Sequence, residues 1–260
     1  MDIIAYYEGS DDVKDWLKKI FPTLPIDFRR LPTRNDTAAF IDLPSYIADI
    51  LLLDKPDVIL AGSIDGIHER PMFSIEFASC TPQYQHALQR FSRMVASVTN
   101  GCPSIIVIPK RKRSNDGASV YTRSKAIEYG AVRLMDLYAC PAFVLDWPDN
   151  DGELIFEKDM QLPALNTPSG KQIVRLLEAS LEAFNNVDYR GALATKPIIR
   201  ELTDDLRVQA YANGVPTPEN PGGGTGGSQA KLEVVDTTEL IDSVAARGPS
   251  FKALMSQLPT

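Results

Sequence analysis

The hydrophobic positions along the chain follow two patterns, short continuous apolar runs and longer stretches with apolar residues at helical spacing. The continuous runs predict buried strands at residues 3–7, 56–61, 72–78, 103–109 and 141–147. The helical spacing predicts helices at about residues 12–21, 45–53, 82–99, 124–138, 170–185 and 197–213. The segment from Pro22 to Pro44 contains four prolines and predicts irregular structure. This order of elements is typical of an α/β fold with a mixed central sheet flanked by helices, and with a helical C-terminal part.

The composition changes abruptly near the C-terminal end of the sequence. Residues 215–230 contain five glycines and three prolines, which predicts a flexible linker. We therefore expect one α/β domain over residues 1–214, then the linker, then a tail with short helices over residues 231–260. A tail of this length cannot build a hydrophobic core of its own. It must dock on the domain, bind a protein partner or stay mobile.

The charge of the chain is unevenly distributed. Lys and Arg number 27 against 34 Asp and Glu, which gives a net charge of −7. This balance argues against a general nucleic-acid coat but not against a nucleic-acid enzyme, because local charge decides binding. Residues 109–133 hold seven basic side chains against two acidic ones. Within them, the run Lys110, Arg111, Lys112 and Arg113 is either a solvated loop or a contact for a phosphate backbone.

Several classes of protein are disfavoured by what the sequence lacks. No apolar run is long enough for a membrane-spanning helix, and the N-terminus has no signal-peptide pattern. Three widely spaced cysteines and two histidines form no zinc-binding pattern, so reduced thiols and a cytoplasmic location are expected. No phosphate-binding glycine loop or serine-hydrolase motif occurs either.

Two acidic residues carry the most specific chemical signal. Asp57 follows Pro56 at the start of one predicted strand, and Glu76 lies in the middle of the next one. A carboxylate inside a buried strand is costly unless it is paired or binds a metal. Two acids on adjacent strands of a hairpin can converge on one divalent cation, and hard oxygen ligands suit Mg²⁺ or Mn²⁺. The alternative for Glu76 is a buried structural ion pair, for example with an arginine.

At these residues the chain resembles the PD-(D/E)xK nuclease superfamily, over roughly residues 45–147. Pro56-Asp57 matches the first motif and Glu76 the second acid, followed by a helix and a buried strand. The resemblance implies a restriction-endonuclease-like core, with Mg²⁺ or Mn²⁺ held by Asp57 and Glu76. It also implies hydrolysis of DNA, in restriction or phage defence. Nucleases that cut duplex DNA commonly act as homodimers or in larger complexes.

The chain departs from the family pattern at position 78, where the motif lysine is replaced by Ala78. Some members of the superfamily instead carry a glutamine and an arginine on the following helix. Here that helix offers Gln89, Arg90 and Arg93, which the resemblance implies as the catalytic groups that stabilise the charge on the phosphate. The basic run at residues 110–113 and Arg29, Arg30 and Arg34 would guide the DNA backbone.

Two alternatives remain open at this stage. The loss of the lysine is also expected in a catalytically dead, nuclease-like module that joins a larger complex through residues 231–260. A second resemblance, of residues 3–9 with Glu8 at their end, is to the first motif of Toprim domains. That family needs a later Asp-x-Asp, and the candidate at residues 149–151 lies too far along the chain. An acidic turn at a helix N-terminus explains residues 8–12 as well.

Overall fold

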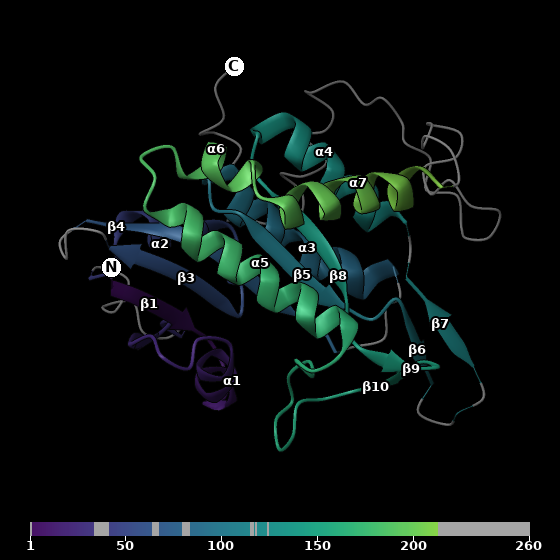
Figure 1. Ribbon diagram of the computed structural model, residues 1–260. Helices are drawn as coiled ribbons and strands as arrows, with labels where there is room; N and C mark the ends of the chain where they lie inside the picture. Colours follow the sequence, from purple (N-terminus) through teal and green to yellow (C-terminus); the bar gives the residue numbers. More distant parts are fainter. Residues whose placement is uncertain are drawn as a thin grey trace, which may run out of the picture. The chain divides into compact units, whose positions relative to one another are not determined.

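The computed structural model of the protein describes residues 2–33, 42–63, 68–79, 84–114, 117, 119–123 and 125–212, with the backbone only at residues 84–88. Its centre is a six-stranded sheet in the order β2-β1-β3-β4-β5-β8 (Figure 1). The strands are β1 (Asp2–Tyr7), β2 (Ile26–Arg30), β3 (Val58–Ser63), β4 (Glu69–Phe77), β5 (Ser104–Ile108) and β8 (Ala142–Asp146).

The sheet is mixed, as the sequence predicts. Strands β1, β3 and β4 are antiparallel neighbours, and β5 and β8 follow on the other side of β4, both parallel to it. The parallel connections run through α3 (Tyr84–Thr99) and α4 (Ala126–Tyr138). All five residues of β5 are buried, which is the expected consequence of a central parallel strand covered on both faces.

The two faces of the sheet are covered by different helices. On one face, Ile4 and Tyr6 of β1 pack in a cluster with Ile47 and Ile50 of α2 (Ser45–Leu53). On the other face, alternate residues such as Ala5 face the main core, which α1 (Asp12–Ile20) and α5 (Pro168–Phe184) complete. Figure 1 shows α5 crossing this face of the sheet. The period-two split of β1 between two clusters confirms the buried strand predicted at residues 3–7.

The C-terminal helical part contains α5, a short α6 (Tyr189–Ala194) that the sequence reading missed, and α7 (Pro197–Tyr211). The predicted linker at residues 215–230 and the tail at residues 231–260 lie outside the described residues. None of the helices in the described part of the chain combines the length and apolar character needed to cross a membrane.

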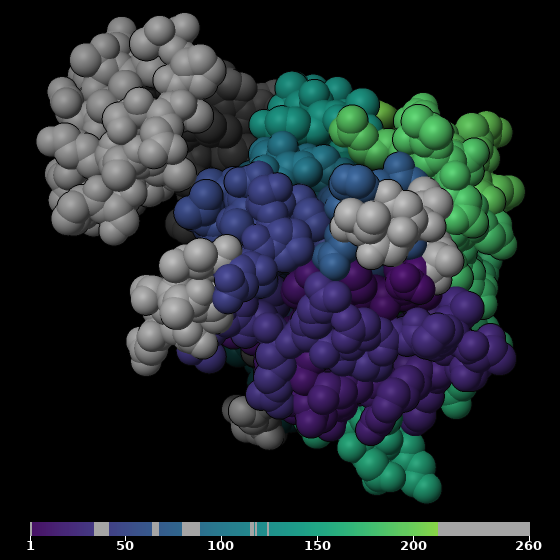
Figure 2. Space-filling model, turned by 90° about the vertical axis from the view of Figure 1, so that its left-hand side faces the viewer, coloured from purple at the N-terminus to yellow at the C-terminus, as the bar shows by residue number. Residues whose placement is uncertain are grey.

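The prediction of irregular structure between Pro22 and Pro44 is wrong for residues 26–30. These residues form β2, which pairs in parallel with β1 along five residue pairs. Ile26 and Phe28 are partly buried and alternate with exposed Asp27 and Arg29. The alternation covers too few residues to stand out, and the hydrogen bonds that form the strand come from β1. Figure 2 shows the molecule from this side, where residues near the N-terminus, coloured purple, form much of the surface.

The basic run is also more ordered than the sequence suggests. Residues 111–113 form β6 (Arg111–Arg113), which pairs with β7 (Val120–Thr122) in an antiparallel hairpin that we call the basic hairpin. Three-residue strands without apolar alternation give no periodic signal. A second small sheet consists of β9 (Asp149–Asn150) and β10 (Glu153–Leu154). It is joined to the basic hairpin by a hydrogen bond from the Arg113 N–H to the Gly152 carbonyl.

Candidate functional site

The acid pair, Asp57 and Glu76, is brought together by the register of β3 and β4. Val58 lies opposite Ile75 in this antiparallel ladder. Asp57, which precedes Val58, is therefore a neighbour of Glu76, which follows Ile75. One carboxylate oxygen of Asp57, Oδ2, accepts the backbone N–H of Phe77 at 2.7 Å. The hairpin predicted from the sequence therefore places the two carboxylates at one edge of the sheet.

Helix α3 supplies two arginines to the acid pair. Arg90 Nη1 donates to Glu76 Oε1 at 3.0 Å, and Arg93 Nη1 donates to Glu76 Oε2 at 2.5 Å. The same Arg93 nitrogen lies 3.3 Å from Asp57 Oδ1. Residues three apart share one face of a helix, which is why both guanidinium groups reach the same carboxylate. We call Asp57, Glu76, Arg90 and Arg93 the acid–arginine cluster.

Burial changes the acidity of both carboxylates. The Glu76 side chain is only 1% exposed, and this burial, together with the charge of Asp57, raises its pKa to about 8. The guanidinium groups of Arg93 and Arg90 act in the opposite direction. Burial also raises the pKa of Asp57, although the Phe77 N–H and Arg93 oppose it. The fold thus tolerates these carboxylates only because cations and N–H groups surround them.

The raised pKa of Glu76 predicts that stability falls as pH rises. The folded value of about 8 exceeds the ordinary value of 4.5, so between them the folded chain binds a proton that the unfolded chain releases. The free energy of unfolding should therefore decrease across this window, by up to about 1.4 kcal/mol per pH unit. Urea unfolding of the wild type and of Glu76→Gln at a series of pH values isolates this contribution as their difference. A pH-independent difference would contradict the prediction.

Two residues that the sequence reading missed complete the surroundings of Arg93. Asp54, directly after α2, has its Oδ1 atom 3.7 Å from Arg93 Nε, and its Oδ2 atom accepts a hydrogen bond from the Ser92 hydroxyl. The sequence did contain a signal, because Asp54 lies just before the Pro56-Asp57 motif and Ser92 just before Arg93. Neither residue type is diagnostic alone, so only the fold reveals the contact.

Glu8, the residue of the Toprim-like segment, also lies at this edge. Its backbone N–H donates to the Asp57 carbonyl at 2.8 Å, and its carboxylate binds Lys55 Nζ at 2.6 Å. The second element of that resemblance is elsewhere in the topology, since Asp149 and Asn150 form β9 of a separate small sheet. Glu8 is therefore an additional acid near the acid pair, held by its own lysine.

Gln89 and Ala78, the other two positions that the family resemblance singles out, make no hydrogen bond with the acid pair in the described part of the chain. The Gln89 side chain is exposed and has no hydrogen-bond partner among the described residues, whereas its carbonyl accepts the Ser92 hydroxyl at 2.9 Å. Ala78, at the position of the family's lysine, is 1% exposed and its N–H binds the Val107 carbonyl at 2.9 Å. The cations that reach the acid pair therefore come from α3.

The four basic residues at positions 110–113 fall into two groups. Lys112 Nζ donates to the Ser79 carbonyl at 2.6 Å, which ties the basic hairpin to the chain just beyond β4, and Arg113 pairs with Asp151 at 2.8 Å. Lys110 and Arg111 are exposed and form no ion pair with any described residue. Among the described residues, two of the four charges are therefore without an ion-pair partner.

The arginines near β2 are already engaged with acids. Arg29 binds Asp27 at 2.8 Å and Glu69 at 2.9 Å, and Arg30 binds Asp11 at 3.0 Å. The third arginine that the sequence associates with this group, at position 34, lies outside the described residues. Because these acids neutralise Arg29 and Arg30, the two arginines attract a phosphate backbone less strongly than Lys110 and Arg111 do.

The acid pair by itself would offer a divalent cation two carboxylates. Within the described ranges, no three or more His, Cys, Asp or Glu side chains are grouped so as to hold a metal. Mg²⁺ is usually bound through one or two carboxylates, with water and substrate phosphates completing its shell. One nitrogen of Arg93 already contacts oxygens of both Asp57 and Glu76, so a single cation can be reached by both.

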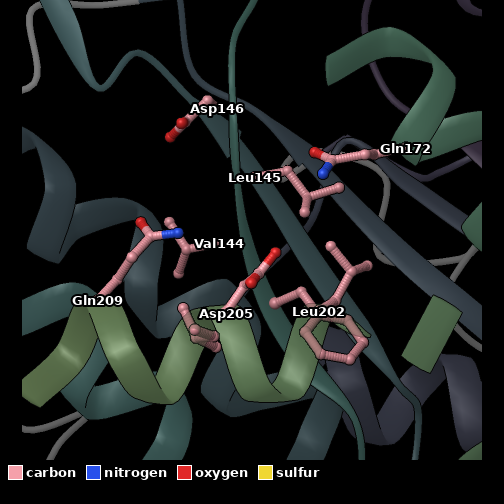
Figure 3. A pocket seen from close by; sticks show the side chains of 9 residues that line it. Val144, Leu145, Asp146, Gln172, Leu202, Asp205 and Gln209 are labelled. Carbon is pink, nitrogen blue, oxygen red and sulfur yellow. The ribbon is translucent and has the colours of Figure 1, made fainter. Parts of the chain in front are cut away.

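A separate pocket lies between β8, α5 and α7 (Figure 3). Figure 3 shows Asp146, Gln172, Asp205 and Gln209 around it as polar groups. The other lining residues are apolar, namely Phe143, Val144, Leu145, Leu202 and Leu206. None of these residues belongs to the acid–arginine cluster, so the pocket and the cluster are distinct features.

Comparison of the chain with protein-family models, with curated proteins and with solved structures finds no match. A function must therefore be inferred from the chemistry of the described residues. Among these, the acid–arginine cluster combines one buried and one partly exposed carboxylate, two cations and a raised carboxyl pKa at one edge of the sheet. Such combinations are typical of functional sites, although structural ion-pair networks share them.

Proposed function

We propose that the protein is a metal-dependent nuclease that hydrolyses DNA phosphodiester bonds in restriction or phage defence. The observation that carries the proposal is the convergence of Asp57 and Glu76 on one nitrogen of Arg93. The topology supports it, because an antiparallel β1-β3-β4 unit is followed by α3 and the parallel β5, the order of elements that the family resemblance implies after the two acids. An enzyme of this kind would act on DNA in the cytoplasm.

Each member of the cluster has a role in this reaction. Asp57 and Glu76 would hold Mg²⁺ or Mn²⁺ through their carboxylate oxygens. When bound, the ion polarises the scissile phosphate and lowers the pKa of a water molecule. Arg90 and Arg93 donate N–H groups to the phosphate oxygens, whose charge grows in the transition state. The exposed amide of Gln89, one residue before Arg90, can hydrogen-bond to the substrate from the same helix.

The basic hairpin would bind the DNA backbone beside the cluster. The strand β5, which precedes the hairpin, has Ile106 opposite Glu76, so the chain reaches Lys110 four residues beyond the level of the acid pair. At about 3.3 Å per residue this is on the order of 13 Å, a few phosphate spacings along a strand. Lys112 fixes the hairpin at this edge through the Ser79 carbonyl.

Replacing both Lys110 and Arg111 by Gln should weaken binding to DNA of any sequence. The slope of log affinity against log salt concentration should become smaller by about 2 for duplex DNA, because two phosphate contacts are lost. Fluorescence anisotropy over a salt series measures both quantities. A matched control replaces Lys171 and Arg175, exposed basic residues of α5, by Gln. An equal change in both double variants would show that overall charge, and not the hairpin, determines binding.

The direct test is incubation of the full chain with supercoiled plasmid and with single-stranded DNA. Cleavage is expected with Mg²⁺ or Mn²⁺, and it should be absent with EDTA and in Asp57→Asn. Duplex cleavage would further call for a homodimer or a larger complex, since one acid pair serves one strand. Cleavage by Asp57→Asn at the wild-type rate would refute the proposal.

The second candidate function is a catalytically dead binding or assembly module that joins a partner through residues 231–260. Both carboxylate oxygens of Glu76 are already satisfied by arginines, and Ala78 is buried where the family has its lysine, which favours this alternative. Divalent metal discriminates the two. A nuclease binds Mn²⁺ and loses it in Glu76→Gln, whereas a dead module binds none in either form.

A further inference from the structure

Arg93 contacts three carboxylates, and not only the two of the acid pair. Its Nη1 atom lies 2.5 Å from Glu76 Oε2 and 3.3 Å from Asp57 Oδ1. Its Nε atom, on the other side of the guanidinium, lies 3.7 Å from Asp54 Oδ1. The group therefore sits between the oxygens proposed to hold a metal and a third acid that lies beside them.

A metal ion on the acid pair and the present position of Arg93 exclude each other. The Nη1 atom contacts one oxygen of Glu76 and one of Asp57, the two side chains that would hold the cation in the proposed site. Mg²⁺ requires these oxygens at about 2.0–2.1 Å. A guanidinium at the same place is also repelled by the dication at short range. Metal binding must therefore move Arg93 off the acid pair.

Among the described residues that pair with Arg93, Asp54 is the one carboxylate outside the acid pair. Its own position is fixed, because Oδ1 accepts the Lys55 N–H at 2.8 Å and Oδ2 accepts the Ser92 hydroxyl. The present separation of 3.7 Å from Arg93 Nε is longer than a hydrogen bond. A small shift of the guanidinium toward Asp54 would shorten this contact while it lengthens the contact with Glu76.

We propose that Asp54 is a positioning residue that receives the Arg93 guanidinium when a divalent cation binds Asp57 and Glu76. Ser92, on the same turn of α3, holds the Asp54 carboxylate for this task. The inference rests on the proposed metal site. Its consequence is that Arg93 competes with the metal in the free protein, yet stays beside the site, where it can bind a substrate phosphate.

The test is the affinity of the full chain for Mn²⁺ without DNA, measured from the electron paramagnetic resonance signal of the free ion. Arg93→Gln should bind Mn²⁺ about tenfold more tightly, because a charged hydrogen bond no longer competes. Asp54→Asn should bind it several-fold more weakly, because Arg93 has lost its alternative partner. The double variant should behave as Arg93→Gln alone, since Asp54 acts only through Arg93.

Three controls complete the cycle. Arg175→Gln removes an ion-paired arginine of α5 and should leave the Mn²⁺ affinity unchanged. Glu76→Gln should lose the ion. Ser92→Ala should weaken Mn²⁺ binding, as Asp54→Asn does, but by less. If Asp54→Asn does not fold, Ser92→Ala replaces it in the test.

The outcomes separate this inference from the proposed function. Unchanged or weaker Mn²⁺ binding in Arg93→Gln, with loss in Glu76→Gln, overturns the role of Arg93 and leaves the metal site intact. If Asp54→Asn weakens Mn²⁺ binding as much in the Arg93→Gln variant as in the wild type, Asp54 is a metal ligand, and this result also overturns the inference. Absence of Mn²⁺ binding in both the wild type and Arg93→Gln refutes the metal site itself.

Discussion

Glu76→Gln is expected to lower Mg²⁺-dependent cleavage of plasmid DNA by more than about 100-fold, since even groups that only support a metal ligand contribute 10- to 100-fold. The substitution keeps the size and one acceptor oxygen of the side chain, but Gln cannot lose a proton to give the carboxylate that a hard cation requires. Arg90 and Arg93 lose their shared carboxylate at the same time. The measurement is the initial rate of nicking over a range of Mg²⁺ concentrations.

A matched control separates chemistry from the general cost of changing a buried acid. Glu128 is also about 1% exposed and also pairs with an arginine, but it lies outside the acid–arginine cluster. Glu128→Gln should lower the midpoint of urea unfolding and leave the cleavage rate of the remaining folded protein unchanged. If both variants lost cleavage in proportion to their loss of stability, Glu76 would be a structural residue and the nuclease proposal would fail.

The acid pair could be predicted from the sequence because its signal is local. Glu76 breaks an otherwise apolar strand, and a charge there must have a partner. The helix after that strand contains arginines at a spacing of three, which places them on one face. The structure brings Arg90 and Arg93 to Glu76, as either an active site or the buried ion pair considered for this residue requires. Metal binding and DNA cleavage are the measurements that separate those two interpretations.

The rest of the site could not be predicted, because it depends on pairings between distant segments. Asp54 is an ordinary polar residue at a helix end until α3 brings Arg93 and Ser92 to it. Strand β2 exists because β1 supplies its hydrogen bonds, and its alternation is too short to be recognised. The burial of Arg123 likewise could not be predicted from the sequence. The sequence shows it only as one of seven basic residues in the segment 109–133, whereas in the structure its side chain is 1% exposed.

Arg123→Met is expected to destabilise the fold by about 3–5 kcal/mol, the usual cost of removing one partner of a buried ion pair. Arg123 donates to Glu128 at 2.9 Å, to Asp146 at 2.7 Å and to the Ile108 carbonyl at 2.7 Å. The side chain of Glu128 is only 2% exposed, and its Oε2 atom has no hydrogen-bond partner among the described residues. Without Arg123 it would be a buried charge with no cation. Urea unfolding with linear extrapolation measures the loss.

A second variant decides whether the unpaired charge is the cause. Arg123→Met combined with Glu128→Leu removes both buried charges and should recover most of the lost stability, because apolar replacements of a whole buried pair are often neutral. Asp146 needs no change, as its side chain is 34% exposed and can be hydrated. If the double variant stayed as unstable as Arg123→Met, the loss would come from the hydrogen bond to Ile108.

That hydrogen bond links the fold to the proposed DNA contact. The Arg123 backbone N–H donates to the Lys110 carbonyl at 2.9 Å, so this one residue joins the end of β5 to the base of the basic hairpin through its side chain and its main chain. The double variant restores the core but not the side-chain contact with Ile108. It should therefore unfold at nearly the wild-type urea concentration and still bind DNA more weakly. Wild-type DNA affinity in the double variant would show that the hairpin is held by Lys112 and its strand pairing alone.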